Sequence, residues 1–480
     1  MSQTQQNQTL TLVRGLTLVA AISIIIGNVI GTGVFLKARV MTCNVGSPGM
    51  VMTVWVVAGL LSLAGALTYA ELTAMMPRAG GEYVFMREAY GPGAGFLSGW
   101  MQILIAKTGS QASVALIFAA SLNDLTGKAV ESASAYGVQL TALAVIIAIT
   151  LLNCAAVKVS GWVATVLTGV KIALVLGIGL GAFFLASGDW GNYALSNLGG
   201  TCEGVSPGAT LGAAGFTGAM LGALWGYDGW NNLTFVAGEV KDPQRNIPRA
   251  LIGGTIVIIL LYLFINAAYF YVLSPTAVAS VSANSSVAAE VTNTFMAPFS
   301  ASAKALVAGL VAAALMASSV GTLHTSVLTG ARVPYAMARD GLFFDKLSKI
   351  SERTRVPARA VLAQGVWACA LVLILQRFDK LTDYVVFGSY IFYGLVTASI
   401  FVFRRRLPHA ERPYRAWGYP VVPALFLIVT AFLLFMTFWA APSEAILGLV
   451  LIGLGFPVYY FFFRNRLPQH SDAADEDEQT

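Results

Sequence analysis

The sequence predicts an all-α polytopic membrane protein with twelve transmembrane helices. Only 11% of the 480 residues are charged, whereas 57% are hydrophobic and the mean hydropathy is +0.72. An ordinary soluble domain is about a quarter charged. The basic residues lie in short loops between long apolar runs, which is the pattern of a membrane protein. A soluble enzyme, a disordered chain and a nucleic-acid binder are therefore excluded, despite a pI near 9.1.

Each predicted span is an apolar run of about 20 residues, the length that crosses the hydrocarbon core of a bilayer. The loops between the runs are marked by Pro, Gly, Asn and Asp, as at Pro77–Gly81 and Asp242-Pro243. In chain order the predicted spans are 16–36, 49–76, 93–120, 138–156, 160–187, 211–236, 251–273, 304–330, 356–376, 382–403, 420–440 and 444–463.

The distribution of Lys and Arg predicts the orientation in the membrane. With the N-terminus inside, the cytoplasmic segments hold 21 of these residues and the external segments hold 6. Cytoplasmic loops are enriched in Lys and Arg, so both termini are expected in the cytoplasm and the protein in the cytoplasmic (inner) membrane. Residues 1–15 then form a cytoplasmic N-terminal tail, and residues 464–480 form an acidic cytoplasmic tail.

Two spans contain residues that a lipid-facing helix does not need. The first contains Gly27-Asn28-Val29-Ile30-Gly31-Thr32-Gly33-Val34-Phe35, and the sixth contains Trp225-Gly226-Tyr227-Asp228-Gly229-Trp230-Asn231-Asn232. Glycine weakens a helix interior, and unwound backbone is tolerated in a bilayer where it lines a cavity. Close helix packing through Gly27 and Gly31 would also explain the first run. Paired interruptions at matching positions favour an inverted-repeat transporter with a binding site at the membrane midplane.

Three ionisable side chains within spans need an explanation, because charged groups in a bilayer are usually functional. Lys171 lies roughly 16 Å from the interface along its span, at 1.5 Å per residue. Either it reaches a local water pocket or it is a cation that satisfies the carbonyls of a broken helix. Lys107 faces a vestibule or pairs with an acid. His324 is either a hydrogen-bonded packing residue or a proton carrier.

The cysteines and histidines give no sign of a metal, a cofactor or an enzyme. Four cysteines and three histidines lack metal-ligand spacing, and no nucleophile–base cluster lies within the spans. Cys43 and Cys202 both fall on the external side of the predicted topology. They form either a disulfide or two free thiols. A channel is disfavoured because it needs a charged or carbonyl-lined pore.

Several motifs, in order along nearly the whole chain, resemble one family. Ile30–Phe35 is similar to the G-S/T-G-I-F signature of the amino acid–polyamine–organocation (APC) superfamily. Further stretches resemble the L-type amino acid transporter (LAT) family in its bacterial form. They are Ala66–Leu72 with Pro77–Tyr83, Tyr227–Asn231 with Glu239–Pro243 and Asn246–Ala250, Gly330–Arg332 with Ala338–Gly341, and Arg412–Tyr414.

The resemblance implies the LeuT-like fold, with two inverted repeats of five helices and two extra helices. The repeats would be 16–187 and 211–403, and the extra helices would lie in 420–463. It implies a secondary active transporter of small or medium neutral L-amino acids, sodium-independent and exchanging, that works by alternating access. Alternatives are a proton-coupled amino acid symporter and a polyamine or organic-cation transporter of the same superfamily.

The resemblance also implies site residues. The substrate carboxylate would meet the backbone N–H groups of the first break and the Thr32 hydroxyl. The ammonium would meet the carbonyls of Val29, Trp225 and Asp228, and Trp225 would close over the substrate. Lys171 would stand in for a sodium ion, with His324 as a second coupling residue. The implied substrate contacts are Val29, Ile30, Gly31, Thr32, Gly33, Ser110, Trp225, Gly226, Tyr227, Asp228, Ser389 and Tyr390.

The sequence departs from the animal members of that family in four places. Asp228 replaces a glycine, His324 replaces an asparagine, and Trp225 replaces a smaller phenylalanine, which suggests a smaller pocket. The loop Asn123–Tyr136 has no cysteine. Animal members use a cysteine there to join a heavy-chain partner, so no such partner is expected for this chain.

Overall fold

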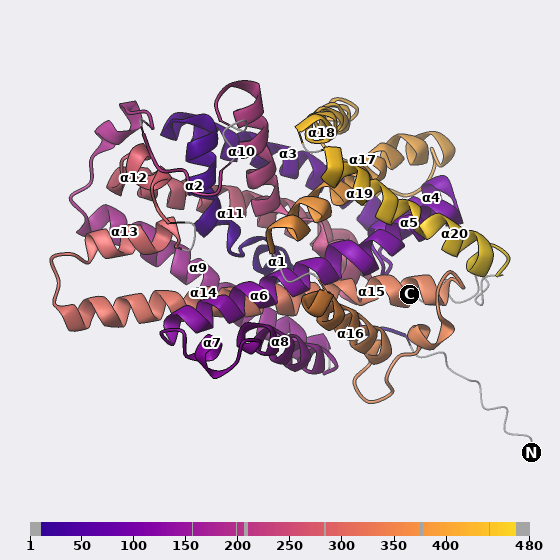
Figure 1. The fold of residues 1–480 in the computed structure, drawn as a ribbon. Coiled ribbons are helices and arrows are strands. Elements are labelled where there is room, and N and C mark those ends of the chain that lie inside the picture. The colour runs from indigo at the N-terminus through magenta and orange to yellow at the C-terminus, as the bar shows by residue number, and fades with distance from the viewer. Residues whose placement is uncertain are drawn as a thin grey trace, which may run out of the picture.

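The computed structural model describes residues 11–155, 157–197, 199–205, 210–282, 285–374, 378–440 and 442–466. Residues 1–10 of the predicted N-terminal tail and 467–480 of the acidic tail lie outside the described residues. Within these ranges the chain is helical, with one isolated parallel bridge between Leu16 and Val240 in place of any sheet. The all-α fold class is confirmed (Figure 1).

The first half of the chain runs from α1 to the 3₁₀ segment η2. Its elements are α1 (Leu18–Val29), α2 (Gly33–Val45), α3 (Pro48–Met75), α4 (Glu82–Tyr90), α5 (Pro92–Met101), the π-helix η1 (Gln102–Ala106), α6 (Lys107–Leu125), α7 (Ala129–Ala133), α8 (Gly137–Asn153), α9 (Val157–Leu185) and η2 (Trp190–Ala194).

The second half runs from α10 to the π-helix η6. Its elements are α10 (Gly212–Tyr227), the 3₁₀ helix η4 (Asn232–Glu239), α11 (Pro243–Val272), α12 (Pro275–Ala279), α13 (Val287–Phe295), α14 (Ala301–Gly330), α15 (Arg332–Arg339), η5 (Asp345–Ser348), α16 (Ala358–Ile374), α17 (Phe378–Arg406), α18 (Val421–Ala440), α19 (Pro442–Gly453), α20 (Gly455–Val458) and η6 (Tyr459–Phe463).

Each of the twelve predicted spans coincides with one helix or with two or three consecutive helical elements. Among the described residues, eight helices are long and apolar enough to cross a membrane, and α1 with α2 makes a ninth as a bent pair. The helices in the predicted spans 138–156 and 356–376 are shorter, at 17 residues each. The predicted span 211–236 is divided between α10, of 16 residues, and η4. This span is short because its helix is broken.

The first break separates α1 from α2 and bends the pair by 40°. The α-helical hydrogen bonds end at Ile30, and the Gly31 N–H donates to the Val29 carbonyl at 2.7 Å instead. Helix α2 starts at Gly33. The carbonyl of the preceding residue, Thr32, accepts hydrogen bonds from the N–H groups of Phe35 and Leu36. The predicted discontinuity of the first span is confirmed.

The second break follows Tyr227. Asp228 leaves the helix with φ −58° and ψ 140°, and Gly229 has a φ of +103°, which favours glycine over any residue with a Cβ. A Cβ at Gly229 would also lie 3.0 Å from the Asn28 side chain, so the two breaks approach each other closely here. The chain continues as the 3₁₀ helix η4 and then as α11.

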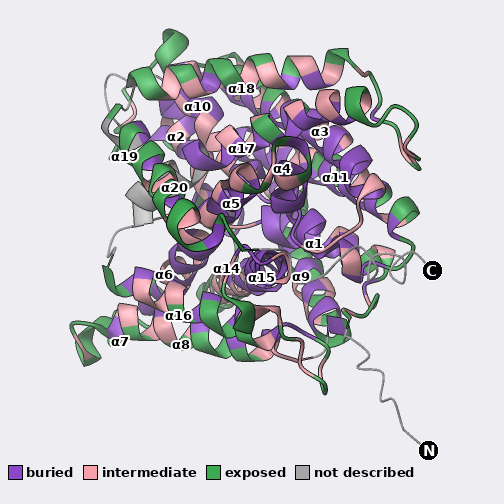
Figure 2. Ribbon diagram, turned by 90° about the vertical axis from the view of Figure 1, so that its right-hand side faces the viewer, coloured by how far each residue is buried: buried purple, intermediate pink, exposed green. Residues whose placement is uncertain are grey.

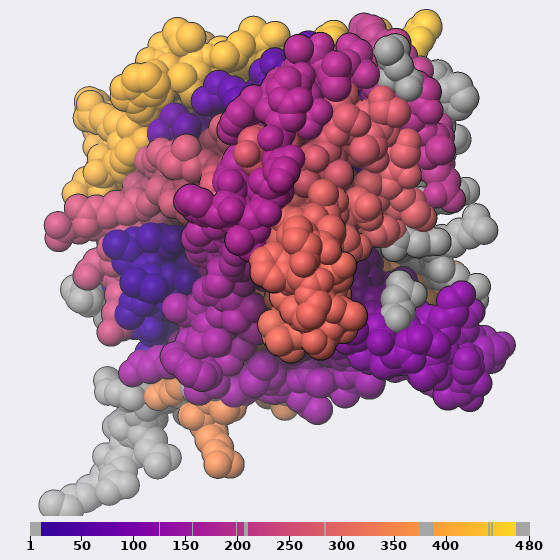
Figure 3. Space-filling view, turned by 90° about the vertical axis from the view of Figure 1, so that its left-hand side faces the viewer, coloured from indigo at the N-terminus to yellow at the C-terminus, as the bar shows by residue number. Residues whose placement is uncertain are grey.

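The broken helices lie at the centre of the molecule. Helix α1 packs against α9, α11 and α14, and α2 packs against α10. In Figure 2 buried residues gather around α1, α14 and α15, whereas α18–α20 are largely exposed at the periphery. In the most apolar stretch of each of the last two spans, 22% and 17% of the residues are buried, whereas 50% are buried in the corresponding stretch of Pro48–Met75. On the face in Figure 3, α13 and the start of α14 (salmon) lie beside α9 and the segment after it (magenta).

Candidate functional site

A pocket lies where the two breaks meet the helices around them. Its lining comes from five predicted spans, and most of it is polar. The residues are Asn28 from α1; Gln102, Ala106, Lys107 and Ser110 from η1 and α6; Asp228, Gly229 and Asn232 at the second break; Thr322 and Ser326 from α14; and Ser389 and Tyr393 from α17. Of the predicted substrate contacts, Ser110, Asp228 and Ser389 line this pocket.

The first break is held by a buried lysine from α9. The Lys171 amine donates to the Gly27 carbonyl at 2.5 Å and to the Thr322 hydroxyl at 2.7 Å, and its side chain has no exposed surface. The Thr322 hydroxyl in turn lies 3.3 Å from the same carbonyl. Lys171 therefore satisfies an acceptor at the end of α1, as the broken-helix hypothesis expects.

Two hydroxyls satisfy other carbonyls along α1 and its end. Thr168, one turn before Lys171 on α9, donates to the Ser23 carbonyl at 2.9 Å. Ser318 on α14 donates to the Ile30 carbonyl at 3.2 Å. Unpaired buried carbonyls are costly, so these contacts stabilise the interruption.

One tyrosine connects the two breaks. The Tyr262 hydroxyl of α11 lies 2.8 Å from the Val29 carbonyl and 2.8 Å from the Gly226 carbonyl. Its proton is shared between acceptors at the ends of α1 and α10. The Val29 carbonyl, predicted to meet the substrate ammonium, thus already receives Tyr262 and the Gly31 N–H.

The second break has charged and polar side chains in the pocket. The Tyr393 hydroxyl donates to the Asp228 carboxylate at 2.6 Å. Lys107 donates to the Asn232 side-chain oxygen, and its amine lies 4.2 Å from the centre of the Phe235 ring. Lys107 therefore lines the pocket, and it interacts electrostatically with Asp228.

A buried carboxylate, which sequence analysis missed, lies next to this group. Glu82, the first residue of α4, accepts hydrogen bonds from Gln102 at 2.7 Å and Tyr69 at 3.1 Å, and from Asn231. Burial raises the pKa of the Glu82 carboxyl from its ordinary value of 4.5 to about 7, while Lys107 and the three donors act in the opposite direction. Glu82 lies outside the apolar spans, between Pro48–Met75 and Pro92–Asn123.

Trp225, the predicted gate, packs across the breaks rather than into the pocket lining. A Cβ on Gly33 would lie 3.1 Å from the Trp225 ring, so the glycine allows this close approach. The Lys37 amine of α2 lies 4.9 Å from the centre of the same ring. Trp225 therefore joins the end of α10 to the start of α2.

His324 lies away from the pocket lining in a fully hydrogen-bonded site. Its Nδ1 is 3.0 Å from the Asn153 amide, and its Nε2 is 2.9 Å from the Ser160 carbonyl. These contacts require Nε2–H to donate and Nδ1 to accept, which describes a neutral imidazole. The geometry favours the packing interpretation of His324 over the proton carrier.

The other predicted contacts lie behind the lining. Ile30, Gly31, Thr32 and Gly33 supply the backbone of the first break. Gly226 contributes the carbonyl that Tyr262 contacts. Tyr227 is buried and donates to the Trp55 carbonyl at 3.1 Å. Tyr390 is buried against Tyr393, with ring centres 5.2 Å apart.

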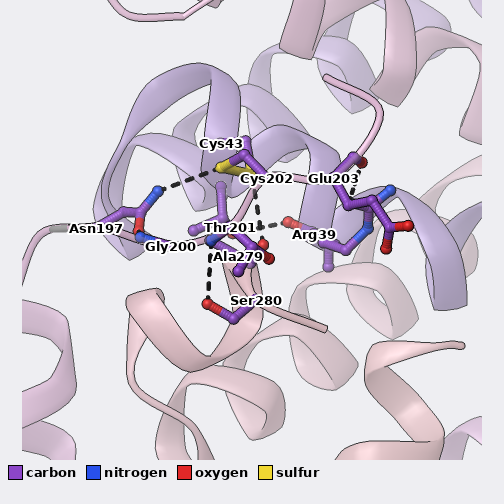
Figure 4. Close-up of a disulfide and its surroundings, with 11 residues drawn as sticks. Arg39, Cys43, Asn197, Gly200, Thr201, Cys202, Glu203, Ala279 and Ser280 are labelled. Carbon is purple, nitrogen blue, oxygen red and sulfur yellow. Dashed lines mark hydrogen bonds between the residues drawn. A yellow bond between two sulfur atoms is a disulfide. The ribbon is translucent and has the colours of Figure 1, made fainter. Parts of the chain in front are cut away.

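A disulfide between Cys43 and Cys202 ties the end of α2 to the segment that precedes α10 (Figure 4). Cys43 lies on α2, and Cys202 lies in the segment between η2 and α10. Around it, Arg39 donates to the Glu203 carbonyl at 2.6 Å, and the Cys202 N–H donates to the Ala279 carbonyl of α12 at 3.2 Å. The disulfide alternative of the sequence analysis is confirmed.

A buried ion pair joins the end of η4 to the start of α15, next to the residues that precede α1. Arg332 donates to the two oxygens of Glu239 at 2.6 and 2.9 Å, and both side chains are fully buried. The Leu16 N–H donates to the Glu239 carbonyl at 2.9 Å, and the Lys241 N–H donates to the Leu16 carbonyl at 2.9 Å. These contacts hold the start of α1 against the end of η4.

Some pocket residues were visible in the sequence only as ordinary polar residues. Asn28 adjoins the predicted break, so its place could have been inferred. Asn232 ends the predicted second interruption and Ser326 lies two residues after His324, so both could have been inferred, whereas no charge or interruption lies within one turn of Gln102 or Tyr393. Within the described ranges, no group of three or more His, Cys, Asp or Glu residues could hold a metal ion.

Comparison with known proteins gives one consistent result. The model of the amino acid permease family matches residues 16–462. The chain is 33% identical over 449 residues to the serine/threonine exchanger SteT of Bacillus subtilis, covering 92% of this chain and 95% of that protein. It is 30% identical to the human b(0,+)-type amino acid transporter 1, covering 96% and 90%. It is also 30% identical to the human large neutral amino acids transporter small subunit 2, covering 92% and 79%.

Proposed function

Since this chain belongs to the amino acid permease family, whose members are membrane transporters and not enzymes, we propose that it exchanges small neutral L-amino acids by alternating access, without sodium. The observation that supports this most directly is the polar pocket between two broken helices. An amino acid has a carboxylate and an ammonium at one end, and the two breaks offer complementary groups to each.

The carboxylate binds at the start of α2. The N-terminus of a helix presents free N–H groups and a positive partial charge, which favour an anion. Gly31, Thr32 and Gly33 supply that backbone here. A Cβ on Gly31 would come no closer than 3.5 Å to the Thr322 hydroxyl, and Thr322 lines the pocket, so a ligand can approach Gly31 from that side.

The ammonium binds at the second break, next to Asp228. The family resemblance implied the Val29 carbonyl as an ammonium contact. That carbonyl, however, already accepts hydrogen bonds from the Tyr262 hydroxyl and the Gly31 N–H. The Asp228 carboxylate lines the pocket and accepts hydrogen bonds from the Tyr393 hydroxyl and the Gly229 N–H, and its remaining lone pairs can accept an ammonium. Lys171 holds the first break in the place that sodium would take.

The substrate side chain is small and uncharged, and it can be polar. Ser110, Ser326 and Ser389, with Asn28 and Gln102, line the rest of the pocket, and these groups hydrogen-bond rather than offer an apolar surface. SteT, the relative from Bacillus subtilis, is a serine/threonine exchanger, and serine and threonine would suit such a pocket. Trp225 closes the outer side over the bound substrate.

The transport cycle has two moving parts. The spans that contain the breaks, with α3 and α11, rock against a scaffold of α6, α8, α14 and α16. Residues 16–187 and 211–403 form the two repeats, and 420–463 contains the extra helices. The protein works in the cytoplasmic membrane with both termini inside and without a heavy-chain partner.

Two alternatives remain within the same family of folds. A polyamine or organic-cation transporter is disfavoured, because Lys107 places a positive charge in the pocket. A proton-coupled symporter is favoured by one observation, the raised pKa of Glu82 beside the pocket. Exchange remains the proposal because the pocket offers partners for the carboxylate, the ammonium and the side chain of an amino acid without requiring a bound ion.

The proposal is tested with the purified protein in proteoliposomes. Uptake of each of the twenty amino acids is measured with and without internal amino acid, sodium and a pH gradient. We expect uptake of L-serine and similarly small substrates to require internal substrate and to be unaffected by sodium. Uptake into empty vesicles driven by a pH gradient would instead establish symport, and transport of polyamines alone would contradict the proposal.

A further inference from the structure

Two carboxylates and a single lysine lie together at the pocket: Glu82 and Lys107 are buried, and Asp228 is half-buried. Lys107 interacts electrostatically with Asp228 on one side and with Glu82 on the other. Glu82 has no exposed surface, and Lys107 is 8% exposed. With all three groups ionised, this part of the molecule has one negative charge more than it has positive charges. Uncompensated charge is expensive in surroundings from which water is excluded.

We infer that Glu82 is a protonation site linked to substrate binding, which takes up a proton when the pocket is empty and releases it when a substrate ammonium binds at Asp228. This rests on the proposed function, since it needs an ammonium at Asp228. In the empty pocket, Lys107 compensates Asp228, and Glu82 becomes neutral by binding a proton. With substrate bound, the ammonium compensates Asp228, Lys107 compensates Glu82, and the proton returns to the medium.

The hydrogen bonds around Glu82 suit both protonation states. Asn231 and Gln102 donate their amide N–H groups to the carboxylate, which suits its ionised form. The side-chain oxygens of the same two amides, Asn231 Oδ1 and Gln102 Oε1, are buried and have no hydrogen-bond partner among the described residues. Turning either amide by 180° would present that oxygen to a protonated Glu82, whose O–H needs an acceptor.

The same two amides connect Glu82 to the substrate site. Gln102 lines the pocket, and Asn231 lies in the second break between Asp228 and Asn232, the partner of Lys107. A change in the protonation of Glu82 therefore reaches the pocket through Gln102, which contacts Glu82 and lines the pocket, and through Asn231, which precedes the lining residue Asn232. The raised pKa of Glu82 agrees with this arrangement, because it places the titration near neutral pH.

Other charged groups packed near α4 are paired elsewhere. Helix α5 has no titratable side chain. From α15, Arg332 pairs with Glu239, and Arg339 lies over the Tyr335 ring. On α4 itself, Arg87 pairs with Asp340 and Glu88. The titratable groups that face Glu82 are thus Tyr69 from α3, Lys107 from α6 and Tyr393 from α17.

Proton release on binding tests the inference directly. Purified protein in weak buffer with a pH-sensitive dye receives L-serine, or the best substrate of the panel, between about pH 6 and 8. We expect the wild type to release up to about one proton per substrate bound, and its affinity to rise with pH by at most about tenfold per unit. Glu82→Gln should bind without proton release and with affinity independent of pH.

Two further variants make the outcome decisive. Glu82→Asp keeps a titratable group, so it should still release protons if the fold tolerates the change. Glu88→Gln removes a carboxylate from the same helix, where it is partly exposed and paired with Arg87, and should behave as the wild type. Binding without proton release in the wild type, or equal release in Glu82→Gln, overturns the inference. Failure of any amino acid to bind overturns the proposed function instead.

Discussion

The two helix breaks are stabilised in different ways. The first depends on Lys171, whose described partners are a carbonyl and a hydroxyl and include no carboxylate. The second has Asp228, Lys107 and, behind them, Glu82. A lysine bound only to neutral groups is held in one geometry. A lysine between two carboxylates can compensate either of them, so its surroundings can respond to a ligand.

This difference separates a structural role from a responsive one. At the first break, removal of the cation leaves the Gly27 carbonyl without its strongest donor. At the second break, neighbouring groups can replace part of a lost interaction. Variants at the first break should therefore have the larger effect on transport, and variants at the second should change its dependence on pH.

Lys171→Ala should cause the largest loss. A hydrogen bond from a charged group contributes about 1.5–3 kcal/mol, so exchange in proteoliposomes should fall roughly 10- to 100-fold, since each 1.4 kcal/mol is about tenfold. Adding sodium tests whether another cation restores the rate. Lys158→Ala, an exposed position near the start of the same helix, is the control. Wild-type exchange in Lys171→Ala would reject the role.

The sequence predicts this first region well and the second only in part. Glycines and an isolated lysine stand out in an apolar run, so the break and Lys171 are visible without a structure. Glu82 is not, because it lies in a loop region with ordinary polar composition and becomes buried only when α3, α6 and η4 meet around it. His324 shows the reverse, since a conspicuous residue proves to be satisfied by Asn153 and Ser160. Long-range packing decides both cases.

Trp225→Ala should have the next largest effect. It removes the ring that joins α10 to α2 over Gly33, so closure above the substrate should weaken. We expect about a tenfold loss of apparent affinity, as for truncation of a buried aromatic contact worth about 1.5 kcal/mol beyond its area. Saturation kinetics of exchange measure this. Trp162→Ala, at an exposed position on α9, should leave affinity unchanged. Unaltered affinity in Trp225→Ala would argue against a gate.

Tyr262→Phe tests whether the two breaks depend on each other, because the Tyr262 hydroxyl contacts a carbonyl at each of them. Loss of a neutral hydrogen bond costs about 1 kcal/mol, so exchange should fall roughly fivefold. Tyr269→Phe is a matched control on the same helix, since the Tyr269 hydroxyl is buried without a partner among the described residues. If the two variants lose activity equally, the Tyr262 hydroxyl does not connect the breaks in any functional sense.

The smallest effect concerns stability and pH, and it isolates the second region without any substrate. The folded-state pKa of Glu82, about 7, lies above its ordinary value of 4.5, so the folded protein binds the extra proton. The resulting stability is fully present below about pH 4.5 and is lost as the pH rises through about 7. Between pH 5 and 8 the melting temperature of the wild type should fall by roughly 1–2 °C more than that of Glu82→Gln. Glu88→Gln should follow the wild type, because that partly exposed carboxylate is not held in the pocket network. Parallel melting curves for the wild type and Glu82→Gln across this range would show that Glu82 stays ionised, and the second break would then be as fixed in its charge as the first.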